Sequence, residues 1–200
     1  MTDTAEQSHR KRELADAVCG VIAARGIRGT TVRAVAREGG WTTGVLTHYF
    51  ADKTEMLNFA CEAWMNRYHI EFLSAIGRRR GLSALRALLS SDLTADEPES
   101  ERGTRIWLSL IEEAARNGAL AGNWRGLYSA YVSECEEHIR EAIEDGEVAD
   151  SCDVATCSTA LIAAVDGINI RRILDPHEFT LAVQRRALEQ ALALLPRPLA

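Results

Sequence analysis

The chain has 200 residues, of which 46% are hydrophobic and 26% are charged, and its formal net charge is -6. This composition excludes a disordered chain, and the length suits one compact unit or a small head joined to a larger body. The sequence holds no run of about eighteen uncharged apolar residues, so we expect no membrane-spanning helix.

The N-terminal segment MTDTAEQSHRKR is polar and lacks the apolar stretch of a secretory signal, so we expect a flexible arm there. A first helix is predicted over residues 10–25, because apolar residues recur at the spacing of one buried face. These residues are Leu14, Val18, Val21 and Ile22. Gly26 is expected to end this helix, as glycine commonly does.

Residues 30–53, TTVRAVAREGGWTTGVLTHYFADK, predict two short helices joined by a tight turn. Gly39 and Gly40 allow the turn, because glycine adopts a positive φ without steric cost. Apolar residues bury the two helices against each other: Val32, Val35, Ala36, Val45, Leu46 and Phe50. The residues left facing outward on the second helix are small and polar. This pattern indicates a helix-turn-helix, whose second helix enters the DNA major groove.

The segment from residue 10 to residue 57 also resembles the DNA-binding head of TetR-type transcriptional regulators. The pattern TTV…VA…G(W)T…G.L..YF..K..ML places glycines, threonines, aromatic residues and a lysine at the spacing of that family. The resemblance implies a dimer on a palindromic operator in double-stranded DNA, most often a repressor that a small-molecule effector releases. Thr47 departs from the family, which commonly has a tyrosine there, so the operator sequence is not carried over.

Base recognition requires donors and acceptors that reach base edges in the major groove. On the second short helix the candidates are Thr42, Thr43, Thr47 and His48, and Gly44 permits close backbone approach. Residues 1–53 carry a net charge of +2 and the rest of the chain carries -8, which favours DNA binding at this end.

Four further residues are candidates for contacts around the recognition helix. Arg33 projects from the first short helix and could pair with a guanine edge or a phosphate. Thr31 caps the same helix, whose N-terminus can touch phosphate. Tyr49 and Lys53 match family positions that hold the DNA backbone. Tyr49 fits packing between the second short helix and the following helix equally well.

Asp52 is expected to cap the next helix, and the sequence predicts six helices from there onward. Their ranges are 53–76, 81–92, 102–116, 120–145, 153–174 and 177–195. The predicted class is all-α with about nine helices. A three-helix helix-turn-helix head occupies residues 1–52, including the arm, and an effector-binding and dimerisation domain occupies residues 53–200. The acidic second half of helix 120–145 is expected to face solvent.

The last two predicted helices suit a dimer interface. The first of them is apolar around most of its circumference, which requires burial on several sides, and the second is amphipathic. Packed on their copies in a second subunit, they would form a four-helix interface. The TetR resemblance implies a homodimer of this kind.

The same resemblance implies a small-molecule effector inside the helical body. The candidate pocket residues are Trp64, Tyr68, Trp107, Tyr128, Asp166 and Asn169. The aromatic members also fit the hydrophobic core, because helical stripes of aromatic residues usually bury themselves. A buried Asp166 needs a partner, which is the effector, an arginine such as Arg171, or the second subunit. The segments IWLSLIEEA and AAVDGI resemble the body of BetI-like members, some of which respond to choline, and an aromatic cage with a carboxylate suits a quaternary ammonium ion.

The cysteines and histidines indicate no catalytic or metal site. The 5 cysteines are dispersed without a CxxC pair, as in the reduced thiols of a cytoplasmic protein. Cys152 and Cys157 are five apart on a predicted helix and so should not share a face. No HExxH, GxSxG or phosphate-loop motif supports an enzyme, and no cofactor is expected. An activator or an effector-independent DNA-binding protein of the same fold is the alternative to a repressor.

Overall fold

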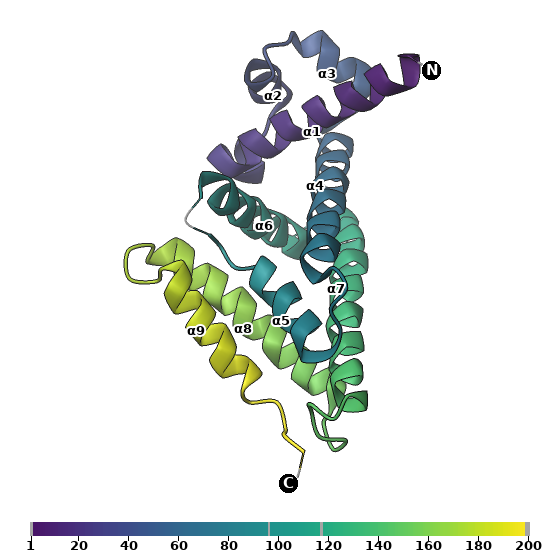
Figure 1. The fold of residues 1–200 in the computed structure, drawn as a ribbon. Coiled ribbons are helices and arrows are strands. Elements are labelled where there is room, and N and C mark those ends of the chain that lie inside the picture. The colour runs from purple at the N-terminus through teal and green to yellow at the C-terminus, as the bar shows by residue number, and fades with distance from the viewer. Residues whose placement is uncertain (1, 96, 117, 199–200) are drawn as a thin grey trace. The chain divides into compact units, whose positions relative to one another are not determined.

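The computed structural model describes residues 2–95, 97–116 and 118–198, which form nine α-helices and no strand (Figure 1). The helices are α1 (Thr2–Gly29), α2 (Val32–Glu38), α3 (Thr43–Tyr49), α4 (Lys53–Ile76), α5 (Gly81–Ser91), α6 (Pro98–Arg116), α7 (Gly118–Glu144), α8 (Val154–Leu174) and α9 (Leu181–Leu192). The predicted all-α class is confirmed. Among the described residues, no helix is long and apolar enough to cross a membrane.

The helices pack into two compact units. The head unit comprises Met1–Tyr68 and Arg102–Arg125, and the body unit comprises His69–Glu101 and Gly126–Ala200. Parts of α4, α6 and α7 therefore belong to each unit. The predicted boundary after residue 52 separates a DNA-binding domain from an effector-binding and dimerisation domain. Because it divides the chain by function and not by packing, it stays a prediction.

Helix α1 begins earlier than the sequence predicts, at Thr2, so the expectation of a flexible arm is wrong. Residues 5–13 contain good helix formers and neither glycine nor proline, and Arg10 pairs with Glu13 at 3.1 Å. Gly26, with φ 66°, interrupts the helix where predicted. The hydroxyl of buried Thr30 donates to the Gly26 carbonyl at 2.9 Å and fixes the chain before α2.

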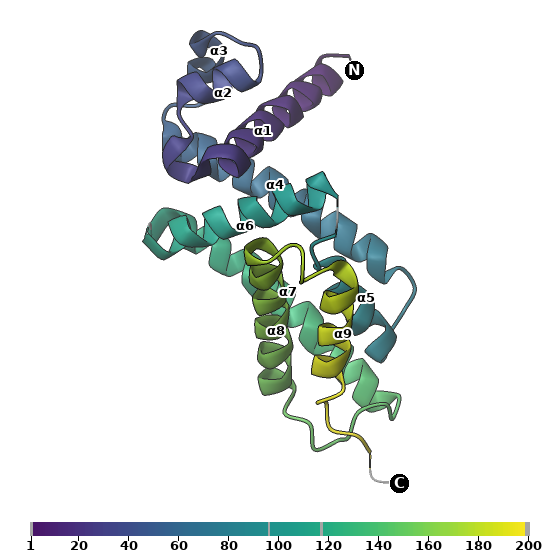
Figure 2. The same ribbon diagram turned by 90° about the vertical axis from the view of Figure 1, so that its left-hand side faces the viewer.

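One hydrophobic cluster holds the head unit together, and α2 packs against both α1 and α3 (Figure 2). The cluster contains most of the residues predicted for the buried faces of these helices, and Val32 and Val45 pack at its edge. The head-unit parts of α4 and α6 add Met56, Leu57, Ala60, Trp64, Ile106 and Leu110. Each fully buried large apolar side chain contributes about 1.5–3 kcal/mol, so the orientation of α3 is strongly fixed.

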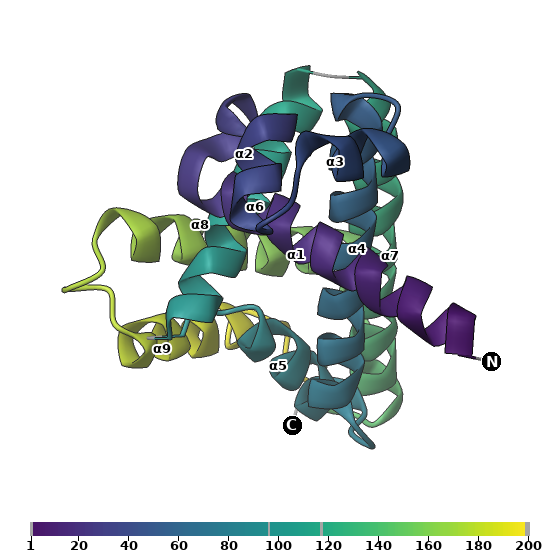
Figure 3. The same cartoon turned by 90° about the horizontal axis from the view of Figure 1, so that it is seen from above.

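Helices α8 and α9 form an antiparallel pair in the body unit (Figure 3). Helix α9 begins at Leu181 and ends at Leu192, which corrects the predicted range of 177–195. The turn before it is held by Arg172, which donates to the Pro176 carbonyl. The guanidinium of Arg171 also lies over the Phe179 ring at 5.4 Å. Because of these contacts, the chain forms a turn where the sequence predicts the first residues of the last helix.

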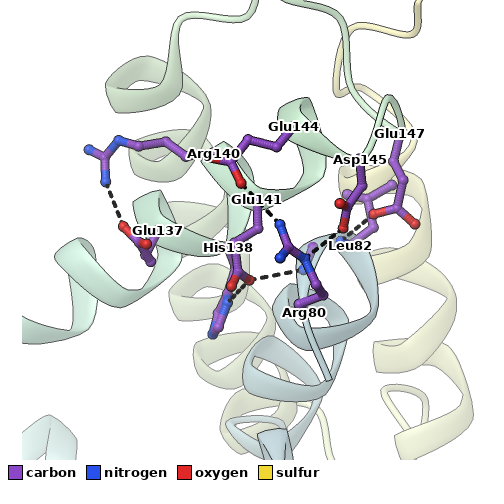
Figure 4. A network of polar contacts seen from close by, with 10 residues as sticks. Arg80, Leu82, Glu137, His138, Arg140, Glu141, Glu144, Asp145 and Glu147 are labelled. Carbon is purple, nitrogen blue, oxygen red and sulfur yellow. Dashed lines mark hydrogen bonds and ion pairs between the residues drawn. The ribbon is translucent and has the colours of Figure 1, made fainter. Parts of the chain in front are cut away.

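The acidic end of α7 binds the start of α5 (Figure 4). The expectation of a solvated face holds for Glu137 and Glu144, whose side chains are 66% and 71% exposed, but not for Glu141. Glu141 accepts a hydrogen bond from the Gly81 N–H at 3.0 Å, and Glu147, in the turn after α7, accepts one from the Leu82 N–H at 2.8 Å. Arg80 adds two ion pairs, to Glu144 at 3.0 Å and to Asp145 at 2.8 Å. Carboxylates suit this place because the first amides of a helix lack partners within the helix.

Candidate nucleic-acid interface and effector site

The helix-turn-helix is shaped by one cap and two glycines. Thr31, as predicted, caps α2 by accepting a hydrogen bond from the Ala34 N–H at 3.2 Å. Gly40 has φ 69°, and a Cβ at Gly39 would lie 2.4 Å from the ring of Trp41. The turn therefore requires glycine at both positions. Gly40 supplies the positive φ, and Gly39 leaves room for the Trp41 ring.

Helix α3 presents the predicted polar face. Leu46 and Phe50 are buried, and the Phe50 ring lies 5.2 Å from the ring of Phe59 on α4. The residues that are exposed together are Thr42, Thr43, Gly44, Thr47 and His48. The predicted orientation of α3 is thus confirmed, whereas the contacts of these residues with DNA stay predictions.

The exposed hydroxyls of α3 differ in what they already bind. Thr42 stands at the N-cap but makes no capping bond with its side chain. The Thr47 hydroxyl lies 3.3 Å from the carbonyls of both Thr43 and Gly44. A Cβ at Gly44 would meet only the Thr42 hydroxyl, at an ordinary 3.6 Å. The fold therefore does not require glycine at position 44.

The flanking candidates lie in two kinds of environment. Arg33 and Thr31 are exposed at α2. Tyr49 is 39% exposed, with its ring edge-on to His48 at 5.3 Å and tilted against Phe50 at 6.5 Å. Its side chain therefore packs on neighbouring rings and also reaches solvent, so both interpretations of Tyr49 stay open.

Lys53 has a contact that the sequence did not indicate. Its Nζ donates to the Ile27 carbonyl at 2.7 Å and so joins the start of α4 to the end of α1. The partners are far apart in sequence and follow no periodic pattern, so no sequence signal could have shown it. An ammonium group has three N–H donors, so this bond leaves others for a phosphate. Asp52 caps α4 as predicted, accepting from the Glu55 N–H at 2.8 Å.

Three candidate pocket residues belong to the head unit. Trp64 is buried in the hydrophobic cluster and stacks on Tyr68 with ring centroids 5.0 Å apart. Trp107 is partly buried against the same cluster. These contacts are those of a packed core, the alternative that the sequence left open for aromatic residues.

Asn169, in the body unit, is engaged within the fold. It is 4% exposed, and its side-chain oxygen accepts from the Thr94 N–H at 3.0 Å and from the Thr94 hydroxyl at 2.9 Å. Its amide nitrogen donates to the Asp92 carbonyl at 2.9 Å. Asn169 therefore fixes the segment after α5, and we do not carry it into the proposed effector site.

Asp166 is half-buried on α8, and its carboxylate forms no hydrogen bond or ion pair within the described parts of the chain. Arg171 pairs instead with Asp175 at 3.7 Å. Burial raises the pKa of Asp166 to about 6, and the nearby carboxylate of Asp92 contributes. Arg171 is therefore not the partner of Asp166, and the effector and a second subunit stay predictions.

Tyr128 lies near the carboxylates of Asp166 and Asp92, and Tyr131 contacts Asp92. Tyr128 is 38% exposed, and its pKa is raised by burial and by the negative charge of Asp166. The Tyr131 hydroxyl donates to Asp92 at 3.3 Å, and its ring lies 5.5 Å from that of Phe72. We call these five residues, Phe72, Asp92, Tyr128, Tyr131 and Asp166, the acidic–aromatic cluster. All of them belong to the body unit.

Two other features bear on ligands. A cavity of about 340 Å³ in the body unit lies between the start of α5, the turn after α7 and α9, and its lining contains none of the candidate pocket residues. Within the described residues, no group of three or more His, Cys, Asp or Glu side chains could hold a metal ion.

Comparison with known families identifies both parts of the chain. Residues 14–59 match the family "Bacterial regulatory proteins, tetR family", and residues 81–197 match "BetI-type transcriptional repressor, C-terminal". The chain belongs to the TetR family. It is a transcriptional regulator with a DNA-binding helix-turn-helix and a ligand-binding C-terminal domain of the BetI type.

Individual TetR-family proteins are similar over nearly the whole chain. The HTH-type transcriptional regulator BetI of Paraburkholderia xenovorans is 28% identical over 180 residues, which cover 85% of each protein. A TetR-family regulator from Rhodococcus sp. is 26% identical, with a TM-score of 0.81 over 94% of this chain and 98% of the other. A regulator from Saccharomonospora viridis, solved in complex with choline, has a TM-score of 0.86 at 18% identity, over 94% of this chain and 97% of the other. At that identity the last comparison supports the fold alone.

Proposed function

We propose that this protein is a homodimeric repressor that binds a palindromic operator and leaves it when a small-molecule effector binds. The observation that carries the proposal is the exposed polar face of α3, a helix anchored by buried Leu46 and Phe50. Major-groove reading needs a fixed helix with donors and acceptors on its outer face. The proposal involves no catalysis, and the place of action is the cytoplasm. The alternative is an activator or a regulator without an effector. A transcription assay with purified polymerase distinguishes these from a repressor.

The proposed DNA contacts fall into two groups. Thr42, Thr43, Thr47 and His48 read base edges, with the backbone at Gly44 close to the DNA. The second group binds phosphates and contains Thr31, Arg33, Tyr49 and Lys53. Arg33 can in addition reach a guanine edge. Contacts of the second kind set the register and produce the salt dependence of binding.

The proposed dimer forms through α8 and α9. The outer face of α8 carries small and apolar residues, among them Ala160, Ala163, Gly167 and Ile170, and ends at Leu174, which is 74% exposed. Such a face on a helix, next to the amphipathic α9, suits contact with its own copy about a two-fold axis. Ala163→Glu should convert the dimer to a monomer in sedimentation velocity, whereas the exposed control Ser83→Glu should leave it a dimer. A dimeric Ala163→Glu variant would place the interface elsewhere.

DNA binding is tested by selecting a bound sequence from random DNA and then measuring fluorescence anisotropy across salt concentrations. A palindromic selected sequence and a steep salt dependence are expected. His48→Ala should weaken binding to the selected operator by about 1–3 kcal/mol and leave binding to random DNA unchanged. Failure to select any sequence would contradict the proposal.

The proposed effector is a small organic cation held by the acidic–aromatic cluster. Asp166 supplies a carboxylate that lacks a partner within the described residues, and Tyr128 supplies a partly exposed ring beside it. A cation among aromatic faces and a carboxylate is stabilised by both. Choline, which the Saccharomonospora viridis regulator holds, is of this chemical class. To act as an inducer, the cation must bind the DNA-incompetent conformation more tightly.

Isothermal titration with choline tests the effector class. The control ligand is the neutral carbon analogue of choline, in which a quaternary carbon replaces the nitrogen. Binding of choline alone, together with release of the operator, would support the proposal. Equal binding of both ligands would show that charge is not recognised, and the body unit would then bind an apolar effector.

A further inference from the structure

Two thiols meet at the start of α8. The Cys152 thiol donates a hydrogen bond to the Cys157 Sγ at 3.3 Å. Cys152 lies in the turn before Asp153, the N-cap of α8, and so escapes the helical spacing that would separate the two side chains. The prediction that these cysteines do not share a face is therefore wrong, because only Cys157 is on the helix.

The backbone holds both cysteines in place. The Cys152 N–H donates to the Ala149 carbonyl at 2.9 Å, and the Ala149 N–H donates to the Pro196 carbonyl at 2.9 Å. The Cys157 N–H donates to the Asp153 carbonyl at 2.9 Å, within the first turn of α8. The contact between the two sulfur atoms is thus built into a hydrogen-bonded turn.

The other cysteines lack these features. Cys19, Cys61 and Cys135 are all buried. Burial raises the pKa of Cys61 to about 11 and also that of Cys152 to about 11, so what distinguishes the pair is the contact between its sulfur atoms and the exposure of Cys157. Cys157 is partly exposed, so solvent reaches it, whereas Cys152 is buried. A thiol that reacts needs access, so Cys157 is where an oxidant would attack first.

We propose that Cys152 and Cys157 are a reversible oxidation site, at which a peroxide converts the two thiols to a disulfide. This inference does not depend on the effector or the operator. The Cys157 sulfur attacks one peroxide oxygen, the O–O bond breaks, and Cys157 sulfenic acid and water form. The Cys152 sulfur then attacks the Cys157 sulfur, the S–O bond breaks, and a second water leaves as the S–S bond forms. Two electrons pass from the thiols to the peroxide, and a dithiol reductant restores the pair by exchange.

The movement that this reaction needs is small. A disulfide bond is about 2.05 Å long, so the sulfur atoms must approach by little more than 1 Å. Rotation about the two Cα–Cβ bonds is expected to supply this, because Cys152 lies in a turn rather than in a helix. The bond would tie that turn, to which Pro196 is joined, to the first turn of α8.

Peptide mass spectrometry tests the proposal directly on the full chain. Both cysteines fall in one tryptic peptide, residues 141–171, whereas the other three fall in different peptides. The reduced protein is exposed to hydrogen peroxide in graded amounts, then unfolded and alkylated. We expect peptide 141–171 to lose both alkylation sites and to be lighter by two hydrogens, while the other cysteines stay alkylated. Dithiothreitol should reverse the change.

Two variants make the test specific. In Cys152→Ser, Cys157 should accumulate a sulfenic acid that dimedone traps, because its resolving thiol is gone. In the control Cys61→Ser, disulfide formation in peptide 141–171 should proceed as in the parent protein. Full alkylation of both cysteines at peroxide levels that oxidise other thiols would overturn the proposal. A disulfide found only between subunits on a non-reducing gel would overturn it as well.

Discussion

Replacing Asp166 by Asn should stabilise the protein at neutral pH and abolish cation binding. In the folded protein, burial and the charge of Asp92 raise the pKa of Asp166 from 3.8 to about 6. The folded state therefore holds the proton more tightly than the unfolded state. The stability that this supplies is fully present below pH 3.8 and is lost as the pH rises through about 6. At pH 7.5 the buried charge thus costs stability that an uncharged amide does not.

The size of the effect follows from the shift. Each pKa unit corresponds to about 1.4 kcal/mol, so a fully buried group with this shift would cost about 3 kcal/mol. Asp166 is only half-buried, and solvent screening reduces the cost to about 1 kcal/mol. For a chain of this length, that corresponds to a rise in Tm of about 2–4 °C.

The assay is thermal unfolding of parent and Asp166→Asn proteins at one protein concentration, between pH 4 and pH 8, with the exposed Asp150→Asn as the control. The difference in Tm should be near zero at pH 4 and should reach its plateau above pH 7. Added choline should raise the Tm of the parent but not that of the variant. A variant that is less stable than the parent at every pH would refute the argument from burial. A choline-induced rise of equal size in both proteins would remove Asp166 from the effector site.

Three further substitutions test the interface and the fold. Gly44→Ala should leave Tm unchanged or raise it slightly, since the position has room for a Cβ. The same substitution should weaken operator binding by about tenfold, and unchanged affinity would mean that DNA does not approach this backbone. Lys53→Ala should lower the slope of log K against log salt by about one unit. It should also cost about 1 kcal/mol of stability, through the lost hydrogen bond to the Ile27 carbonyl. A loss of stability with an unchanged slope would mean that Lys53 supports the fold and does not contact DNA. Glu141→Gln should cost about 1 kcal/mol at pH 7, because the hydrogen bonds from His138 and Gly81 hold the pKa of Glu141 below 4.5. This difference should shrink as the pH falls through the lowered pKa, and a difference that grows with acid would contradict this reasoning.

The sequence predicts what local signals determine. The range of α4, 53–76, follows from the Asp52 cap and from Gly77, which has φ 61° after the last turn. The outward face of α3 follows from the spacing of its apolar residues. Both features depend on neighbours within a few positions, where propensity, capping and periodicity act.

The sequence fails where the partner is distant or where a helix ends. The Gly81 amide and Glu141 are separated by 60 residues, and no periodic pattern connects them. The contact between Cys152 and Cys157 was missed for a different reason, since both cysteines were given helical spacing although α8 begins at Val154, after the Asp153 cap. Helix boundaries are the least certain part of a sequence-based prediction, and here one boundary decides the chemistry of two thiols.

Two polar residues on α8, three positions apart, show how structure separates architecture from function. Both are polar residues on an otherwise apolar helix, and from the sequence both are candidates for the effector pocket. The side chain of Asn169 is hydrogen-bonded through both its oxygen and its nitrogen, so its burial is accounted for by the fold. Asp166 has no such partner among the described residues, and because burial raises its pKa to about 6 we expect its charge to lower stability at neutral pH. A ligand or a second subunit that compensates the charge would explain why a side chain that destabilises the free chain is present. That reasoning, rather than likeness to a choline-binding relative, makes Asp166 the residue on which to test the effector.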